Sequence, residues 1–160
     1  MKELWRNLET MYNCDVEIIE FENMYKRPER KRLGDCGYDV YAAETVTIPA
    51  HANEATRVDL GFGVKLPEGV TCYLHNRSGT FKRGLIVSDA LMDYNYRGSM
   101  GAYFINTTNE DIVIERGERP ASLIFTSCYG INFLSADEAQ AKYEAFESSR
   151  GSARENSSGK

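Results

Sequence analysis

The central part of the chain alternates apolar residues with polar residues or glycine, with a period of two. Residues 58–66 show it most clearly, through Val58, Leu60, Phe62, Val64 and Leu66. Successive side chains of a strand point to opposite faces of a sheet, so the pattern predicts half-buried β-strands. The same reasoning predicts strands at 16–21, 70–74, 84–87, 100–105, 111–115 and 121–128. Many short strands with no helix between them predict an all-β sandwich or barrel.

Helical periodicity is expected only towards the two ends of the chain. Residues 1–12 place their apolar side chains on one face and predict a short helix, so 1–14 is interpreted as a helical extension. The domain itself is expected to span residues 15–147.

The C-terminal segment combines a helix signal with a polar tail. Ser135 and Glu138 have the spacing of a capping box, which predicts a short helix carrying Tyr143 and Phe146. Residues 148–160 are polar apart from one alanine and rich in Ser and Gly, so they are expected to form a flexible tail.

Composition narrows the functional class. A chain of 160 residues with 42% hydrophobic residues suits one globular domain. The net charge of −5 does not favour nucleic acid or an anionic membrane, so any phosphate site must be a local cluster of positive charge. The four cysteines are scattered and form no CxxC pair, which favours a reducing compartment. Since the sequence also has no long apolar run and no signal peptide, a soluble protein of the cytoplasm or nucleus is expected.

Three segments carry candidate chemistry, each with a structural alternative. Arg77-Ser78-Gly79 suits a phosphate chain, because an arginine lies beside a hydroxyl and free amides, but it also suits an ordinary polar turn. Asp93 follows an apolar run and precedes a turn with two tyrosines, so it is either a general base beside a sugar or a turn former. Asp39 enters an apolar strand, either as a strand-edge charge or as a group holding the hydration shell of a metal.

The charged segment 116–121, RGERPA, is interpreted structurally. It is expected to form a hairpin turn whose charges pair with one another. The two histidines form no Ser/His/Asp pattern, and the zinc deaminase signature is absent. The terminal Ser158-Gly159-Lys160 lacks the earlier glycine of a P-loop.

Five segments, in order, resemble the motifs of the trimeric dUTPase family: CGYDVYAAE, NRSG, LMDYNYRG, RGERPASLIF and RGSARENSSGK. The resemblance runs from about residue 36 to the C-terminus. It implies a jelly-roll-like barrel, a homotrimer with active sites between subunits, and Mg²⁺ as cofactor.

The resemblance also implies roles for particular residues. Asp93 would deprotonate the water that attacks the α-phosphorus, and Tyr96 would pack against the deoxyribose. Arg77, Ser78 and Gly79 would hold the phosphates, and Asp39 would bind Mg²⁺ through water. The remaining implied substrate contacts are Ser88, Leu91 and Met92 around the base, Ser122 in the fourth motif, and Arg150, Ser157, Ser158 and Gly159 of the tail.

The departures from the family pattern concern the base more than the phosphates. Glu155 stands where the family usually has an aromatic residue over the uracil, Ser122 where it has Gln, and Asn76 where it has Pro. The loop 87–91 is about one residue shorter than usual, and Ala90 replaces a glycine.

The implied activity is hydrolysis of dUTP to dUMP and pyrophosphate, which keeps uracil out of DNA. No direct nucleic-acid or membrane partner is expected, and the location would be the cytoplasm or nucleus, or the host cytoplasm for a viral protein. Three alternatives stay open. They are hydrolysis of another or modified deoxypyrimidine triphosphate; dCTP deamination, which needs a Glu where Tyr103 stands; and a non-catalytic nucleotide-sensing or protein-binding module.

Overall fold

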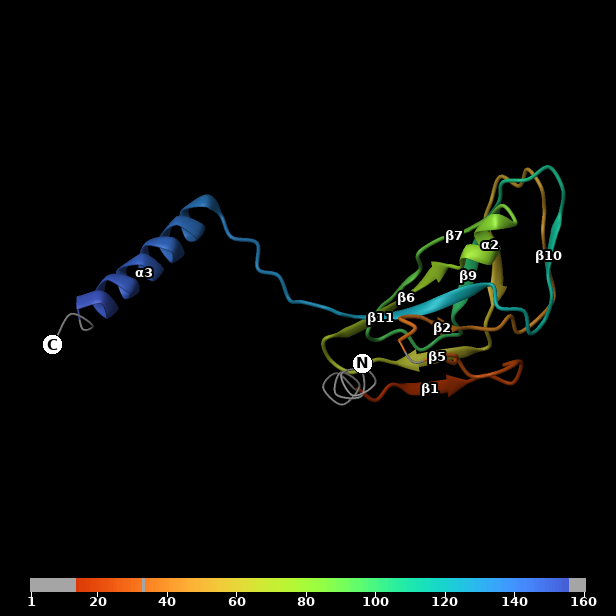
Figure 1. Ribbon diagram of the computed structural model, residues 1–160, viewed down its shortest axis with the longest axis horizontal. Helices are drawn as coiled ribbons and strands as arrows, with labels where there is room; N and C mark the ends of the chain where they lie inside the picture. Colours follow the sequence, from red (N-terminus) through yellow and green to blue (C-terminus); the bar gives the residue numbers. More distant parts are fainter. Residues whose placement is uncertain (1–13, 33, 156–160) are drawn as a thin grey trace. The chain divides into compact units, whose positions relative to one another are not determined.

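The computed structural model describes residues 14–32 and 34–155, with side chains up to residue 147 (Figure 1). The helix predicted for residues 1–12 lies outside the described residues. The chain divides after Cys128 into two compact units. The first unit contains β1 (Glu17–Glu20), β2 (Tyr38–Asp39), β3 (Val46–Ile48), β4 (Thr56–Asp59), β5 (Phe62–Lys65), β6 (Val70–Asn76), α2 (Ser78–Lys82), β7 (Leu85–Val87), β8 (Leu91–Met92), β9 (Gly101–Asn106), β10 (Ile112–Ile114) and β11 (Ala121–Ser127).

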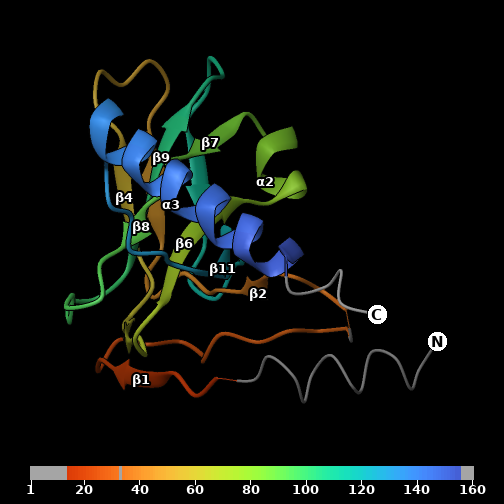
Figure 2. The same cartoon turned by 90° about the vertical axis from the view of Figure 1, so that its left-hand side faces the viewer.

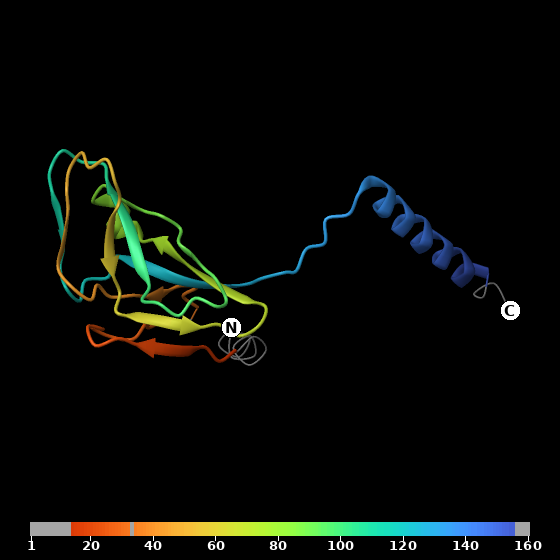
Figure 3. The same cartoon turned by 180° about the vertical axis from the view of Figure 1, so that it is seen from behind.

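All strand pairs of this unit are antiparallel, and they form four small sheets. Their strand orders are β1-β5, β10-β3, β2-β11-β6-β8 and β4-β9-β7. Figures 1 and 3 show β1 (red) beside β5 (yellow), at one side of the unit. The longest ladder joins β6 to β11 from Ala121↔Asn76 to Ser127↔Val70. The all-β prediction is confirmed, and the β6–β11 ladder positions the candidate site.

The sheets enclose one apolar core, as the period-two pattern requires. In β9, Ala102, Phe104 and Asn106 are buried, whereas Tyr103 and Ile105 are exposed. The buried Asn106 amide is satisfied, because its Nδ2 donates to the carbonyls of Ile48 (3.0 Å) and Glu110 (2.8 Å). Alternation therefore assigned the two faces of this strand correctly.

The alternating run 58–66 is divided between two strands, β4 and β5. Gly61 lies between β4 and β5 with φ at +70°, a conformation that residues with a side chain rarely adopt. A Cβ at this position would lie 2.6 Å from the Cα of Met24, so the neighbouring loop also requires glycine.

A helix interrupts the strands where none was expected. The five-residue α2 follows β6 directly and packs beside β7 (Figure 2). Its first turn closes when the Phe81 amide donates to the Arg77 carbonyl at 2.9 Å. The Thr80 hydroxyl is buried and donates to the Pro120 carbonyl at 2.9 Å. This long-range bond stabilises a turn that five residues of sequence do not specify.

The second unit contains α3 (Ala136–Glu155). The predicted capping box is confirmed, because the Ser135 amide donates to Glu138 at 2.8 Å and the Glu138 amide donates to the Ser135 hydroxyl at 3.3 Å. These hydrogen bonds lower the pKa of Glu138 below its usual value. The helix is longer than expected and includes residues 148–155, where Ala, Glu and Arg are good helix formers. Among the described residues, no helix is long and apolar enough to cross a membrane.

Candidate active site

The first group of candidate residues lies where β6 ends. The register places Ser122 of β11 opposite Asp39 on one side and His75 of β6 on the other. Since β11 lies between β2 and β6, Asp39, Ser122 and the residue after β6, Arg77, come to the same end of one sheet. Segments 80 residues apart in sequence thus meet, as the Asp39–Arg119 contact shows.

Asp39 binds two arginines. Its Oδ2 accepts a hydrogen bond from Arg119 Nη1 at 2.8 Å, and its Oδ1 lies 3.3 Å from Arg77 Nη2. The Asp39 side chain is 15% exposed, so this ion-paired group is partly shielded from solvent. Two guanidinium groups around one carboxylate leave the cluster with a net positive charge, which suits an anionic ligand.

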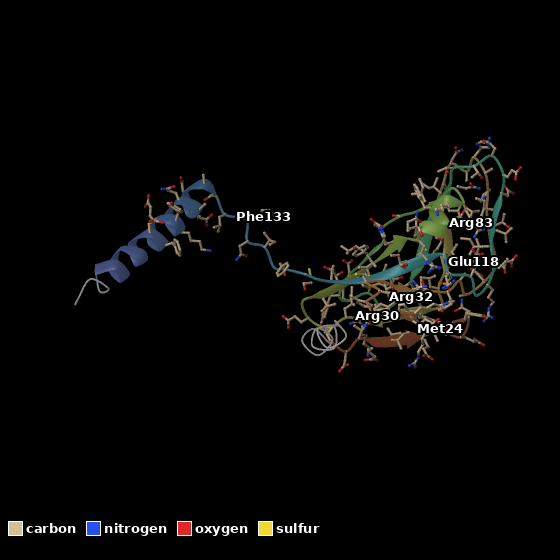
Figure 4. All side chains as sticks on the ribbon, viewed as in Figure 1. Met24, Arg30, Arg32, Arg83, Glu118 and Phe133 are labelled. Atoms are coloured by element: carbon tan, nitrogen blue, oxygen red, sulfur yellow. The ribbon has the colours of Figure 1, made fainter. Side chains whose placement is uncertain are left out.

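Three side chains of residues 77–83 bind three successive residues of the turn 118–120. Arg77 donates to the Arg119 carbonyl at 3.0 Å, and Thr80 donates to the Pro120 carbonyl. Arg83 forms an ion pair with Glu118, and Figure 4 shows these two side chains close together. The segment that carries the predicted phosphate contacts is therefore fixed to the segment that opens β11.

These contacts correct the prediction for the charged turn 116–121. Its charges do not pair with one another. Glu118 and Arg119 bind Arg83 and Asp39, and Arg116 donates to the Ala43 carbonyl at 2.9 Å. The long side chains reach partners that only the tertiary structure brings near. Arg119 was missed as a functional candidate for the same reason, because its partner is known only from the β2–β11 register.

Ser78 and Gly79 begin α2 and are exposed. A Cβ on Gly79 would meet no atom within 4 Å, so the packing of this chain does not require glycine there. The space beside the Gly79 backbone is open to a ligand.

The second group of candidate residues lies in the turn after β8. Met92 pairs with Cys72 of β6, and its carbonyl accepts a hydrogen bond from the Thr71 hydroxyl at 2.8 Å. The Tyr96 amide donates to the Asp93 carbonyl at 3.0 Å, which closes a turn with an exposed Asp93. This turn presents a carboxylate and an aromatic ring to solvent.

The ring of Tyr96 lies over Gly98. A Cβ on Gly98 would lie 2.5 Å from the Tyr96 hydroxyl oxygen, so glycine is needed for the ring to pack there. The hydroxyl donates to the Ser99 carbonyl at 3.1 Å, while 46% of the residue stays exposed. One anchored ring with an open face can pack against a flat ligand group.

Asp59 supports the chain just after this turn. Its carboxylate accepts hydrogen bonds from Ser99 Oγ at 2.6 Å, Asn23 Nδ2 at 2.8 Å and Arg57 Nη2 at 3.0 Å. Burial acts to raise the pKa of Asp59, but the hydrogen bonds from Ser99 and Asn23 and the charge of Arg57 outweigh it, so the pKa lies below its usual value.

The two groups are far apart within one chain. Met92 lies opposite Cys72, whereas Arg77 follows the end of β6, five residues farther along. At 3.3 Å per residue, that separation is about 17 Å. The two groups therefore lie well apart along β6 within one copy.

The loop predicted to contact the base lies between these groups. The Ser88 amide donates to the Tyr103 carbonyl at 2.9 Å, and Asp89 Oδ1 lies 3.2 Å from His75 Nδ1. Asn76 fixes the preceding strand, since its side chain binds the Leu85 carbonyl and the Val87 amide, each at 3.2 Å. Asn76, which stands where the family pattern has Pro, thus links β6 to β7 by hydrogen bonds. Leu91 is 63% exposed at the end of this loop.

The C-terminal candidates are described only in part. The backbone of Arg150 is helical within α3, and Ser157, Ser158 and Gly159 lie outside the described residues.

The chain is similar to several known proteins. The chain is 39% identical over 100 residues to the deoxyuridine 5'-triphosphate nucleotidohydrolase of Yarrowia lipolytica, covering 62% of each chain. It is 30% identical over 117 residues to the protein of the same name from Monkeypox virus, covering 73% of this chain and 76% of the relative.

Two solved phage structures share the fold. The dUTPase of Staphylococcus bacteriophage 80alpha, determined with dUPNHPP, has a TM-score of 0.70 at 22% identity, covering 79% of this chain and 90% of that one. A mutant dUTPase from phage phi11 of S. aureus, whose structure shows the coordination of a structural Mg(II) ion, has a TM-score of 0.67 at 22% identity, covering 78% and 98%.

The dUTPase family profile matches residues 23–152, a span that contains both groups of candidate residues. This chain belongs to the dUTPase family.

Proposed function

We propose that the protein hydrolyses dUTP to dUMP and pyrophosphate. The observation that carries the proposal is the pair of site fragments on β6, a phosphate-type arginine cluster at one end and an exposed carboxylate beside an open tyrosine ring at the other. Relatives from a yeast and a poxvirus are deoxyuridine 5'-triphosphate nucleotidohydrolases, which agrees with this reaction. It would keep uracil out of DNA by removing its precursor.

Each fragment has a distinct task in the proposed reaction. Asp93 accepts a proton from the water that attacks the α-phosphorus, and its exposed position leaves room for that water. Tyr96 packs against the deoxyribose and leaves no room for a 2′-hydroxyl. Arg77, Ser78 and the Gly79 amide bind the phosphate oxygens, where positive charge stabilises the charge that develops on the leaving pyrophosphate.

The other proposed contacts select the substrate and close the site. Ser88, Leu91, Met92 and Ser122 would contact the nucleotide from β8, β11 and the loop before β8. Arg150, Ser157, Ser158 and Gly159 would close over the phosphates and exclude water.

Mg²⁺ is proposed as the cofactor, carried by the triphosphate. The described residues contain no group of three or more His, Cys, Asp and Glu that could hold a metal ion, and both oxygens of Asp39 face guanidinium groups. The described residues therefore form no metal site of their own, and the remaining lone pairs of Asp39 would accept a hydrogen bond from a water on an ion that the triphosphate carries. Triphosphate oxygens are common ligands of Mg²⁺.

A homotrimer is proposed, in which a second copy supplies Asp93 to each Arg77. The separation of about 17 Å along β6 between the two fragments supports it. The β4-β9-β7 sheet also has an exposed apolar face, on which Ile86 pairs directly with Ile105 beside Tyr103. Such a face suits contact between copies.

A reducing compartment, the cytoplasm or nucleus, is proposed as the location. All four cysteines are among the described residues and are free. No direct nucleic-acid or membrane partner is proposed.

The test is pyrophosphate release from a panel of deoxynucleoside triphosphates, including modified pyrimidines, with and without Mg²⁺. We expect fastest release from dUTP, and none without the metal. A larger kcat/KM for a modified pyrimidine would reassign the base and keep the reaction. Ammonia release from dCTP would identify a deaminase, and binding without turnover would identify a sensor.

A further inference from the structure

We propose that Asp39 and Arg119 are positioning residues that act through Arg77, holding its guanidinium group against the triphosphate. The inference rests on the proposed function and deepens it. Each oxygen of Asp39 faces an arginine, Oδ1 facing Arg77 at 3.3 Å and Oδ2 facing Arg119 at 2.8 Å. A carboxylate in this state orients arginines.

Arg77 is held at two points that fix the plane of its guanidinium group. Nη2 faces Asp39 at 3.3 Å, and Nη1 donates to the Arg119 carbonyl at 3.0 Å. A guanidinium group has five N–H donors in a planar fork, so donors remain for a ligand. The side chain is 27% exposed, which leaves one side of the fork accessible.

The carbonyl that holds Arg77 is itself fixed. Its neighbours on either side are Glu118, which pairs with Arg83, and Pro120, whose carbonyl accepts from the buried Thr80 hydroxyl. Arg119 thus contributes a rigid backbone contact to Arg77 and a side-chain contact to Asp39. A preorganised donor loses less entropy when it binds a phosphate than a mobile one does.

The carboxylate also keeps the two guanidinium groups at a fixed spacing. Arg77 and Arg119 both contact Asp39, and without it they would repel each other and turn towards solvent. Loss of Asp39 should therefore act through the arginines and weaken phosphate binding even when Mg²⁺ is saturating.

The experiment is a double-mutant cycle of Asp39→Asn and Arg77→Gln. Its readout is the Kd at saturating Mg²⁺ for inorganic triphosphate and for dUpNHpp, the ligand written dUPNHPP above. We expect each single variant to weaken binding by about 10- to 100-fold, and the double variant to bind no more weakly than Arg77→Gln alone. Additive losses would show that Asp39 acts independently of Arg77 and would overturn the proposal.

A Mg²⁺ titration separates the proposal from a metal role. In Asp39→Asn, ligand binding should stay weaker at saturating Mg²⁺ if the residue acts through Arg77, whereas a tenfold increase in the half-saturating Mg²⁺ concentration with normal ligand binding at saturating Mg²⁺ would overturn the proposal. Asp111→Asn is the matched control, because Asp111 only accepts a hydrogen bond from the Ala50 amide at 2.9 Å. Its ligand binding should equal that of the wild type.

Two further variants keep the test independent of folding and of the proposed reaction. Arg119→Gln with Arg77→Gln forms a second cycle if Asp39→Asn does not fold, and the two losses should again be non-additive. If the wild type releases no pyrophosphate from dUTP, the proposed function fails. The inorganic triphosphate cycle still decides whether the three residues act as a unit.

Discussion

Asp93 lies in the exposed turn after β8, one residue beyond the last residue that pairs with β6. The Asp93 carboxylate makes no ion pair with any residue of 14–32 or 34–147, so it is available to accept a proton from a bound water. The neighbouring Tyr96 ring is anchored by its hydroxyl and by Gly98, independently of the Asp93 side chain.

Asp93→Asn should therefore separate catalysis from binding. We expect kcat to fall by about 10²- to 10⁴-fold, the usual contribution of a positioned base, while dUpNHpp binding stays near that of the wild type. Steady-state pyrophosphate release and calorimetry measure the two effects. Asn95→Ala, in the same exposed turn, is the control, and near-normal turnover in Asp93→Asn would remove this residue from the mechanism.

Cys72 differs from the other three cysteines in its surroundings. It is fully buried in β6, and burial raises the pKa of its thiol to about 12, whereas Cys14, Cys36 and Cys128 are exposed. The thiolate is the reactive species. A chromogenic disulfide should label the three exposed thiols in the native protein and the fourth only after unfolding, and immediate labelling of all four would contradict this packing.

At the scale of elements, β6 positions both groups of candidate residues. It pairs with β11 and β8 and ends at Asn76, just before Arg77, and the Asn76 side chain links it to β7. Its partners β11 and β8 each bring one candidate segment to it. The positions of the two site fragments therefore follow from the register of three strands.

The β4 strand supports the Tyr96 turn through Asp59, and this contact has a defined pH dependence. The folded-state pKa of Asp59 lies below its usual value of 3.8, since bonds from Ser99, Asn23 and Arg57 outweigh the effect of burial. The stabilisation is thus fully present above the unfolded-state pKa and is lost as the pH falls through the folded-state pKa.

Asp59→Asn should accordingly be less stable than the wild type at neutral pH, and the difference should shrink below about pH 4. Urea unfolding at pH 7 and at about pH 3 measures it. An equal difference at both values would show that the charge of Asp59 does not contribute.

At the scale of the whole molecule, the separated fragments make a strong prediction about assembly. Arg77→Gln and Asp93→Asn should each be nearly inactive. When equal amounts of the two variants are unfolded together and refolded, about one quarter of the wild-type rate should return. Half of the sites then have an intact Arg77, and about half of these sites receive an intact Asp93 from another copy.

The separately refolded variants, mixed afterwards, are the control for subunit exchange. No recovery in the co-refolded sample would show that both residues serve one site from the same chain. Light scattering on the same samples should give the mass of a trimer. Ile105→Lys tests the exposed apolar face of Ile86 and Ile105, because a charge there should weaken the contact between copies and lower that mass.

The sequence by itself determined the fold class and the family. Alternation with a period of two predicted the strands, because each strand buries one face against a shared core, and this signal is local. The capping box at Ser135 was equally readable, because both of its hydrogen bonds form within one turn. The order of five short motifs was sufficient to indicate the dUTPase family, although no single motif was.

Only the tertiary structure decided which charges meet. Asp39 and Arg119 lie 80 residues apart, and their ion pair depends on a two-residue pairing of β2 with β11 that no local pattern specifies. The same holds for α2, which depends on the bond from Thr80 to Pro120, and for Gly61, which divides one alternating run into two strands. Charged side chains are long, and strand register decides which partners they reach, so the segment RGERP pairs with distant segments only when the chain folds. The separation of about 17 Å between the site fragments depends on the same register.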